Sequence, residues 1–180
     1  NGPAGVKAAF DELRAKAKAD GLEGVAIAGC AKPGAHQELV QAGFTFLTGY
    51  NYNDTRRGDN KAKSFRRLIE VNRQILEDVA ATTPLPYIPV VTAGWDRRPW
   101  EQGDSPLSQP PSQRTGWYPD RSPQLLEEFM CMSLDWLEQH PDKTTAERLL
   151  LVYAWNENGE GAYLTPTEAE GTSYLQAIQR

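Results

Sequence analysis

The sequence has 180 residues, 39% hydrophobic and 24% charged, which is enough to bury a core as a single domain. The formal net charge is −5 and the densest basic spots are isolated pairs such as Arg56-Arg57, so a nucleic-acid partner is excluded. No run of about 18 apolar residues is present, which excludes a membrane-spanning helix.

The predicted elements alternate along the chain. A helix over residues 3–20 begins near Pro3 and ends at Gly21. Apolar runs too short for helices indicate buried strands, and apolar residues at three-and-four spacing indicate helices. In order, we expect a strand over 24–30, a helix over 34–42, a strand over 43–50, a helix over 60–82, a strand over 86–95, a helix over 123–140, a strand over 148–155 and a helix over 172–180.

This alternation predicts an α/β fold of parallel βα units, because strands that are apolar throughout are covered on both faces by crossover helices. Four such units are half of a (β/α)₈ TIM-type barrel, which typically needs about 250 residues. The pattern alone is equally compatible with a small open α/β sheet. The chain is one domain in both cases.

The links that follow the strands are long, polar and aromatic, whereas the links that precede them are short. Four of the five tryptophans lie in these long links or at their start, at Trp95, Trp100, Trp117 and Trp155. Function in barrel and doubly wound folds resides at the carboxyl ends of the strands. We expect the segment 94–122 to fold over those ends and to wall a pocket containing Glu157.

Two glutamates three positions apart, Glu157 and Glu160, flank an Asn-Gly pair at the end of the last strand. Asn-Gly is a strong turn signal, and a four-residue turn brings its end residues within about 7 Å. Two neighbouring carboxyl groups cannot easily both ionise, so one can act as acid and the other as base, as in glycoside cleavage. The alternative is a plain β-hairpin with solvated glutamates at its tip.

The segment AWNENGEGAYLTP resembles the Trp-Asn-Glu-x-x-Glu-Gly-x-x-Leu-x-Pro segment of family 99-like glycoside hydrolases and WbsX-like proteins. Upstream, VVTAGWDRRPW and AGFTFLTGYNY are similar to two further strands of those proteins. The resemblance implies that the chain is the carboxyl-terminal half of a (β/α)₈ barrel whose amino-terminal half is absent.

The resemblance also implies catalytic roles. In family 99 the first glutamate of the motif, here Glu157, is the base on the sugar's own 2-hydroxyl. The second, here Glu160, protonates the leaving oxygen and later activates water, so that configuration is retained. This sequence departs from the pattern at Asn158-Gly159, where family 99 has Trp-His; the resemblance therefore does not carry over the sugar or the linkage.

Aromatic and polar residues at the strand ends are candidates for binding a sugar, since tyrosine and tryptophan combine an apolar face with a polar tip. The expected substrate-binding residues are Tyr50, Tyr52, Trp95, Asp96, Trp155 and Asn156. The alternatives are packing at the barrel mouth for the aromatic residues and a local ion pair with Arg97 or Arg98 for Asp96.

The sequence has no zinc-ligand spacing, phosphate-binding loop or dinucleotide fingerprint, so we expect no metal and no cofactor. The only cysteines, Cys30 and Cys131, are expected to be buried free thiols.

The expected function is a retaining glycoside hydrolase acting on an oligosaccharide or polysaccharide. The alternatives are a WbsX-like glycosyltransferase of surface polysaccharide synthesis and a non-catalytic glycan-binding barrel. We expect the sheet edges to be covered by the missing barrel half or by a partner chain. The compartment stays open, with a weak preference for a periplasmic or extracellular site.

Overall fold

The computed structural model describes residues 2–31, 36–104 and 106–179. Its helices and strands, in chain order, are α1 (Pro3–Ala19), β1 (Ala28–Cys30), α2 (Gln37–Gln41), β2 (Phe46–Thr48), α3 (Phe65–Thr82), β3 (Tyr87–Ile88), β4 (Val90–Thr92), α4 (Arg98–Glu101), α5 (Pro123–Gln139), β5 (Leu151–Tyr153), β6 (Asn156–Glu157), β7 (Ala162–Tyr163) and α6 (Ser173–Gln179). Short 3₁₀ turns occupy η1 (Pro111–Gln113) and η2 (Asn158–Glu160). The predicted α/β class is confirmed.

The strands β1 to β5 are parallel, and their order in space follows their order in the chain. Strand β2 pairs with β1 and β3, and β4 pairs with β5. Only Pro89, which has no N–H to donate, separates β3 from β4. The carbonyl oxygen of Pro89 still accepts a hydrogen bond of 2.9 Å from the amide of Leu151. The carboxyl ends of all these strands therefore point the same way, toward one side of the molecule.

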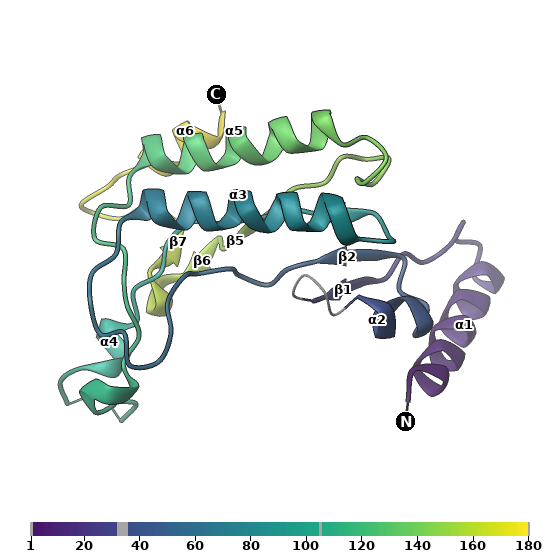
Figure 1. The fold of residues 1–180 in the computed structure, drawn as a ribbon, viewed down its shortest axis with the longest axis horizontal. Helices are drawn as coiled ribbons and strands as arrows, with labels where there is room; N and C mark the ends of the chain where they lie inside the picture. Colours follow the sequence, from purple (N-terminus) through teal and green to yellow (C-terminus); the bar gives the residue numbers. More distant parts are fainter. Residues whose placement is uncertain (1, 32–35, 105, 180) are drawn as a thin grey trace.

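Helices α3 and α5 run side by side over the strands, and α6 packs against α5 (Figure 1). The core between the helices and the strands contains fully buried side chains such as Leu47, Phe65 and Phe129. The indole of Trp136 on α5 donates a hydrogen bond of 3.1 Å to the carbonyl of Leu76 on α3, so the two helices are joined by a polar contact as well as by packing.

The observed helix α3 is shorter at its start than the predicted range of 60–82. The Ser64 hydroxyl accepts a hydrogen bond from the amide of Arg66 and caps the helix at this point. Asp120, from a distant loop, accepts another from the amide of Phe65 at 2.8 Å. Asn60 has a φ of 36°, outside the helical region, which is why residues 60–64 do not join the helix.

The observed strands are also shorter than the predicted apolar runs. Residues 24–27 lie outside β1, and the run over 86–95 is divided at Pro89 and ends at Thr92. The predicted strand 148–155 is reduced to β5, since Arg148 has a φ of 50° that no regular strand adopts. The predicted helix over 34–42 is seen as α2, and residues 34 and 35 lie outside the described residues. Apolar composition identified the parallel strands but overestimated their lengths.

Within the described residues, β1 and β5 each pair with one neighbouring strand only. Leu149 and Leu151 are 43% and 44% exposed beside and within β5, and Leu22 is 58% exposed before β1. Both ends of the strand array are thus unpaired, and exposed leucines lie at the β5 end. The expectation of buried cysteines is wrong: Cys30 lies on β1 and Cys131 on α5, and both are exposed.

Helix α1 stands beyond β1, away from α3 and α5, and packs against α2 (Figure 1). Phe10 meets Phe44 edge to face at 5.0 Å, and Arg14 donates a hydrogen bond of 2.6 Å to the carbonyl of Gly43. None of the described helices is both long and apolar enough to cross a lipid bilayer.

Truncating Phe129 to alanine in the complete protein is expected to lower the free energy of unfolding by about 3–5 kcal/mol, because the ring is fully buried. Leu134→Ala on the same helix is the matched control, since Leu134 is 45% exposed, and a surface change should cost about 0.5 kcal/mol or less. Denaturant unfolding of both variants measures the difference; equal losses would contradict the assignment of the core.

Candidate active site

The segment after β5 forms a hairpin. Strand β6 pairs antiparallel with β7, Glu157 lies opposite Ala162, and the turn η2 joins the two strands. Gly161 closes the turn with a φ of 66°, in the left-handed region that favours glycine. The hairpin of the alternative interpretation therefore exists, but its two glutamates have different environments.

The hairpin packs backbone to backbone on the loop that follows β4. The amide of Asp96 donates a hydrogen bond of 2.6 Å to the carbonyl of Glu160. A Cβ on Gly94 would lie 2.2 Å from the carbonyl oxygen of Gly161, and one on Gly159 would lie 2.3 Å from the indole of Trp100. Three glycines thus allow a close approach that any side chain would prevent.

Glu160 points toward the strand ends and is only 16% exposed at its side chain. The Tyr153 hydroxyl of β5 donates a short hydrogen bond to its Oε2. The Nε of Arg97 lies 3.7 Å from its Oε1. Burial raises the pKa of Tyr153, and the hydrogen bond with Glu160 raises it further. The hydroxyl therefore remains protonated and can act as a donor to the carboxylate.

Glu157 is partly buried, and its carboxylate has no hydrogen bond or ion pair with the residues that the structure describes. It is therefore available to a substrate, whereas Glu160 is already held by protein groups. The hairpin thus carries two carboxylates: that of Glu160 is held by protein groups, and that of Glu157 is not.

Asp96 forms a bidentate ion pair with Arg98, with contacts of 2.9 Å to Nε and 2.6 Å to Nη2. The guanidinium of Arg98 also lies 4.5 Å from the centre of the Trp117 ring. Asp96 thus has the local ion pair that was the alternative to sugar binding, and a sugar hydroxyl would have to compete with Arg98 for it.

The predicted aromatic residues differ in exposure. Tyr50 and Trp155 are 65% and 57% exposed and offer large free surfaces, and the ring of Tyr50 lies 4.9 Å from that of Tyr153. Trp95 is only 7% exposed. Asn156 is exposed and pairs with Tyr163 through the backbone. Of the predicted aromatic residues, Tyr50 and Trp155 therefore have the most exposed rings.

A hollow of about 350 Å³ lies between the hairpin and the loop after β4. Its lining includes Trp95, Asp96, Tyr118, Asn158 and Tyr163, but neither glutamate. The long loop does contact the hairpin, yet the expected pocket containing Glu157 is not formed by these residues alone.

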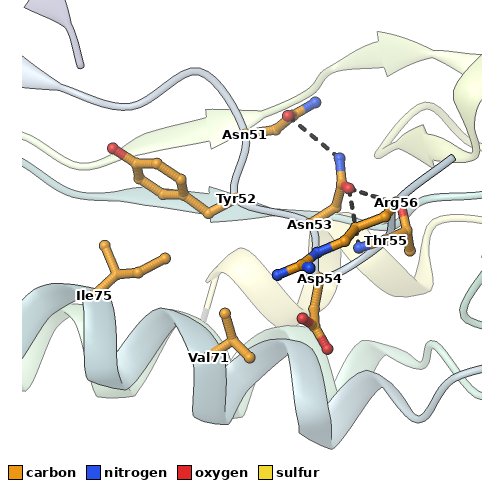
Figure 2. Close-up of a pocket in the computed structure, with 8 residues that line it drawn as sticks. All are labelled: Asn51, Tyr52, Asn53, Asp54, Thr55, Arg56, Val71 and Ile75. Atoms are coloured by element: carbon orange, nitrogen blue, oxygen red, sulfur yellow. Dashed lines mark hydrogen bonds between the residues drawn. The ribbon is translucent and has the colours of Figure 1, made fainter. Parts of the chain in front are cut away.

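A second hollow, of about 440 Å³, lies between the segment 51–56 and helix α3, as Figure 2 shows. Val71 and Ile75 of the helix lie opposite Tyr52 and Asp54. The Tyr52 hydroxyl donates a hydrogen bond of 2.7 Å to the carbonyl of Ala31. Tyr52 therefore joins the segment just after β1 to the loop after β2.

No cluster of three or more histidine, cysteine, aspartate or glutamate side chains suited to a metal ion occurs among the described residues.

Residues 4–178 match the family model described as glycosyltransferase WbsX. The chain belongs to this WbsX family. The match covers nearly the whole chain and confirms the resemblance seen in the motifs. No curated protein matches the sequence closely enough to be compared.

Two solved structures share the fold of this WbsX family chain. One is described as a glycoside hydrolase-like protein, with a TM-score of 0.64 and 15% identity, covering 97% of this chain and 49% of that one. The other is the GH99 endo-alpha-mannosidase from Bacteriodes thetaiotaomicron in complex with BIS-TRIS-Propane, with a TM-score of 0.52 and 12% identity, covering 99% and 51%. The chain thus spans about half the length of both.

Four residues around the hairpin were not identified from the sequence of this WbsX family member: Arg97, Trp100, Glu101 and Tyr153. Tyr153 belongs to an apolar run and looked like a core residue, and Arg97 looked like a partner of Asp96. A usable signal was present for Tyr153, since it lies seven residues before Glu160, on the strand that leads into the hairpin.

Replacing Gly161 by alanine is expected to be more damaging than its positive φ alone explains. A Cβ there would lie 2.8 Å from Cβ and 2.9 Å from the amide nitrogen of Asp96. Gly103 is the matched control, because it also has a positive φ, 71°, and nothing lies within 4 Å of its Cβ position.

Gly103→Ala should therefore lower the free energy of unfolding by about 1–2 kcal/mol, because only the left-handed backbone is strained. Gly161→Ala should lower it clearly more. Equal losses in thermal or denaturant unfolding of the complete protein would mean that the close contact between hairpin and loop is absent.

Proposed function

We propose that this chain is the carboxyl-terminal half of a (β/α)₈ barrel and that the complete barrel is a retaining glycoside hydrolase. The parallel strands follow one another in space in chain order, without the reversal that marks a doubly wound sheet. Both edges of this array are unpaired within the described residues. Coverage of about half of each related structure agrees with a second half that completes the barrel.

The observation that carries the proposed chemistry is the environment of Glu160 at the carboxyl ends of the strands. Its carboxylate is mostly buried, is hydrogen-bonded to Tyr153 and lies beside Arg97. A glutamate at the tip of a purely structural hairpin would be solvated. The unengaged Glu157 on the same hairpin supplies the second carboxylate that glycoside cleavage needs.

In the proposed reaction, Glu157 removes the proton from the 2-hydroxyl of the sugar, and that oxygen attacks the neighbouring anomeric carbon. Glu160 gives its proton to the leaving oxygen as the glycosidic bond breaks. Water, activated by the Glu160 carboxylate, then opens the 1,2-anhydro ring, and the proton returns to the 2-hydroxyl through Glu157. Two inversions at the anomeric carbon give retention. Tyr50 and Trp155 offer the exposed rings on which the sugar stacks.

The description of the WbsX family favours a second candidate, a glycosyltransferase of surface polysaccharide synthesis. The two activities differ in the acceptor, which is water for a hydrolase and a sugar hydroxyl for a transferase. Mass spectrometry of products formed from oligosaccharides in water, and from a sugar-nucleotide donor with an acceptor, separates them. Binding in calorimetry with no product in either reaction would support a glycan-binding barrel.

The two glutamates are expected to respond differently to the leaving group. Glu160→Gln should slow substrates with poor leaving groups by about 10²–10⁴-fold, the usual contribution of general acid catalysis. The first step with an activated aryl glycoside should survive, because that leaving group needs little protonation. Glu157→Gln should slow both substrates, because the 2-hydroxyl must lose its proton whatever leaves. Steady-state and burst kinetics of the complete protein measure these effects.

Glu168→Gln is the control, since Glu168 is exposed just beyond the hairpin, and it should leave both rates unchanged. A substrate lacking the 2-hydroxyl should be inert to the unmodified enzyme. Brisk retaining hydrolysis of that analogue would make Glu157 an ordinary nucleophile. Equal, small losses of rate in both glutamine variants would mean that the two glutamates are only part of a surface turn.

A further inference from the structure

The Glu160 carboxylate is approached at its two oxygens by side chains from two different elements. Tyr153, on β5, donates to Oε2. Arg97, from the loop after β4, places Nε 3.7 Å from Oε1, which is too long for a hydrogen bond but close enough for ionic attraction. This Nε is buried and has no hydrogen-bond partner among the described residues.

Arg97 is itself held in place. Its guanidinium lies 5.2 Å from the centre of the Trp100 ring and 5.9 Å from that of Trp95. Its Nη1 lies 3.6 Å from Oε1 of Glu101, a side chain that is only 4% exposed. The other oxygen of Glu101 accepts hydrogen bonds of 2.8 Å and 3.1 Å from the amide and hydroxyl of Thr115. The hydrogen bonds between Glu101 and Thr115 therefore hold the long loop together next to Arg97.

Tyr153 is equally constrained. It is 7% exposed, it belongs to a paired strand, and its ring packs edge to face with Tyr50. A protonated phenol has one hydrogen to donate, and here that hydrogen is directed at Oε2. Oε1 is thereby left as the oxygen that can exchange a proton with a substrate.

We propose that Tyr153 is a positioning residue that fixes the rotamer of Glu160 and leaves Oε1 as its reacting oxygen, with Arg97 aligning that oxygen. The inference rests on the proposed function for its kinetic consequence, but the geometry of Glu160 can be examined without any substrate.

The other charged and titratable groups around Glu160 are accounted for. Asp96 is neutralised by Arg98, and Glu101 acts on Glu160 only through Arg97. Glu157 belongs to the same hairpin, and Tyr50 contacts Tyr153. Among the described residues, Tyr153 is therefore the group that donates a hydrogen bond to the Glu160 carboxylate.

The test compares Tyr153→Phe with Tyr118→Phe in the complete protein. Both changes remove one buried tyrosine hydroxyl and keep the ring; the Tyr118 hydroxyl accepts a hydrogen bond from the amide of Asp54 and does not contact Glu160. Tyr153→Phe should lower kcat about 10- to 100-fold with little change in KM, as expected for a hydrogen bond to a charged group. Tyr118→Phe should leave kcat unchanged.

Crystal structures of the complete protein and both variants provide the second readout. Glu160 should adopt one rotamer in the unmodified protein and in Tyr118→Phe, and a different or divided one in Tyr153→Phe. An unchanged Glu160 rotamer in Tyr153→Phe would overturn the proposal, as would equal kinetic losses in both variants. If the unmodified protein cleaves no glycoside, the proposed function fails, and the rotamer comparison alone decides whether Tyr153 positions Glu160.

Discussion

The arrangement of this site depends on the close backbone contact between the hairpin after β5 and the loop after β4. The hydrogen bond from the Asp96 amide to the Glu160 carbonyl, and the meeting of Gly94 with Gly161, fix the two segments against each other. Parallel pairing of β4 with β5 brings the starts of both segments to the same place. The glycines then remove the side chains that would keep the backbones apart.

This contact explains why two residues that looked alike in the sequence have different environments. Glu160 lies at the point where the hairpin touches the loop, so its carboxylate comes within reach of Arg97 from the loop and of Tyr153 from the strand. Glu157 lies opposite Ala162, in the paired part of the hairpin. The difference between a held and an unengaged carboxylate thus arises from tertiary contact, which the local spacing of the two residues does not encode.

The alternation of parallel strands and long helices along the chain could be predicted, because periodicity and apolar runs are local properties, whereas the short helix α4 was not predicted. Helix α5 matches its predicted range to within one residue, from Pro123 after the Ser122 cap to Gln139. The glutamate pair was proposed from its turn and its motif. Tyr153, Arg97 and Glu101 were missed because their contacts are with residues 7, 63 and 14 positions away in the chain, at Glu160, Glu160 and Thr115. The division at Pro89 and the exposed cysteines were missed for the same reason, since pairing and burial are decided by neighbours in space.

The buried side chain of Glu101 also divides the long loop into a part that is held by hydrogen bonds and a part that is exposed at the surface. Its carboxylate binds Thr115, and its carbonyl accepts hydrogen bonds from the amide of Gln109 and from Nε of Arg114. The base of the loop is therefore closed around Glu101, whereas Gly103, Asp104 and Leu107 lie at the surface. A substitution at one of these exposed positions can accordingly alter the outer surface of the loop while the ion pair between Glu101 and Arg97 stays in place.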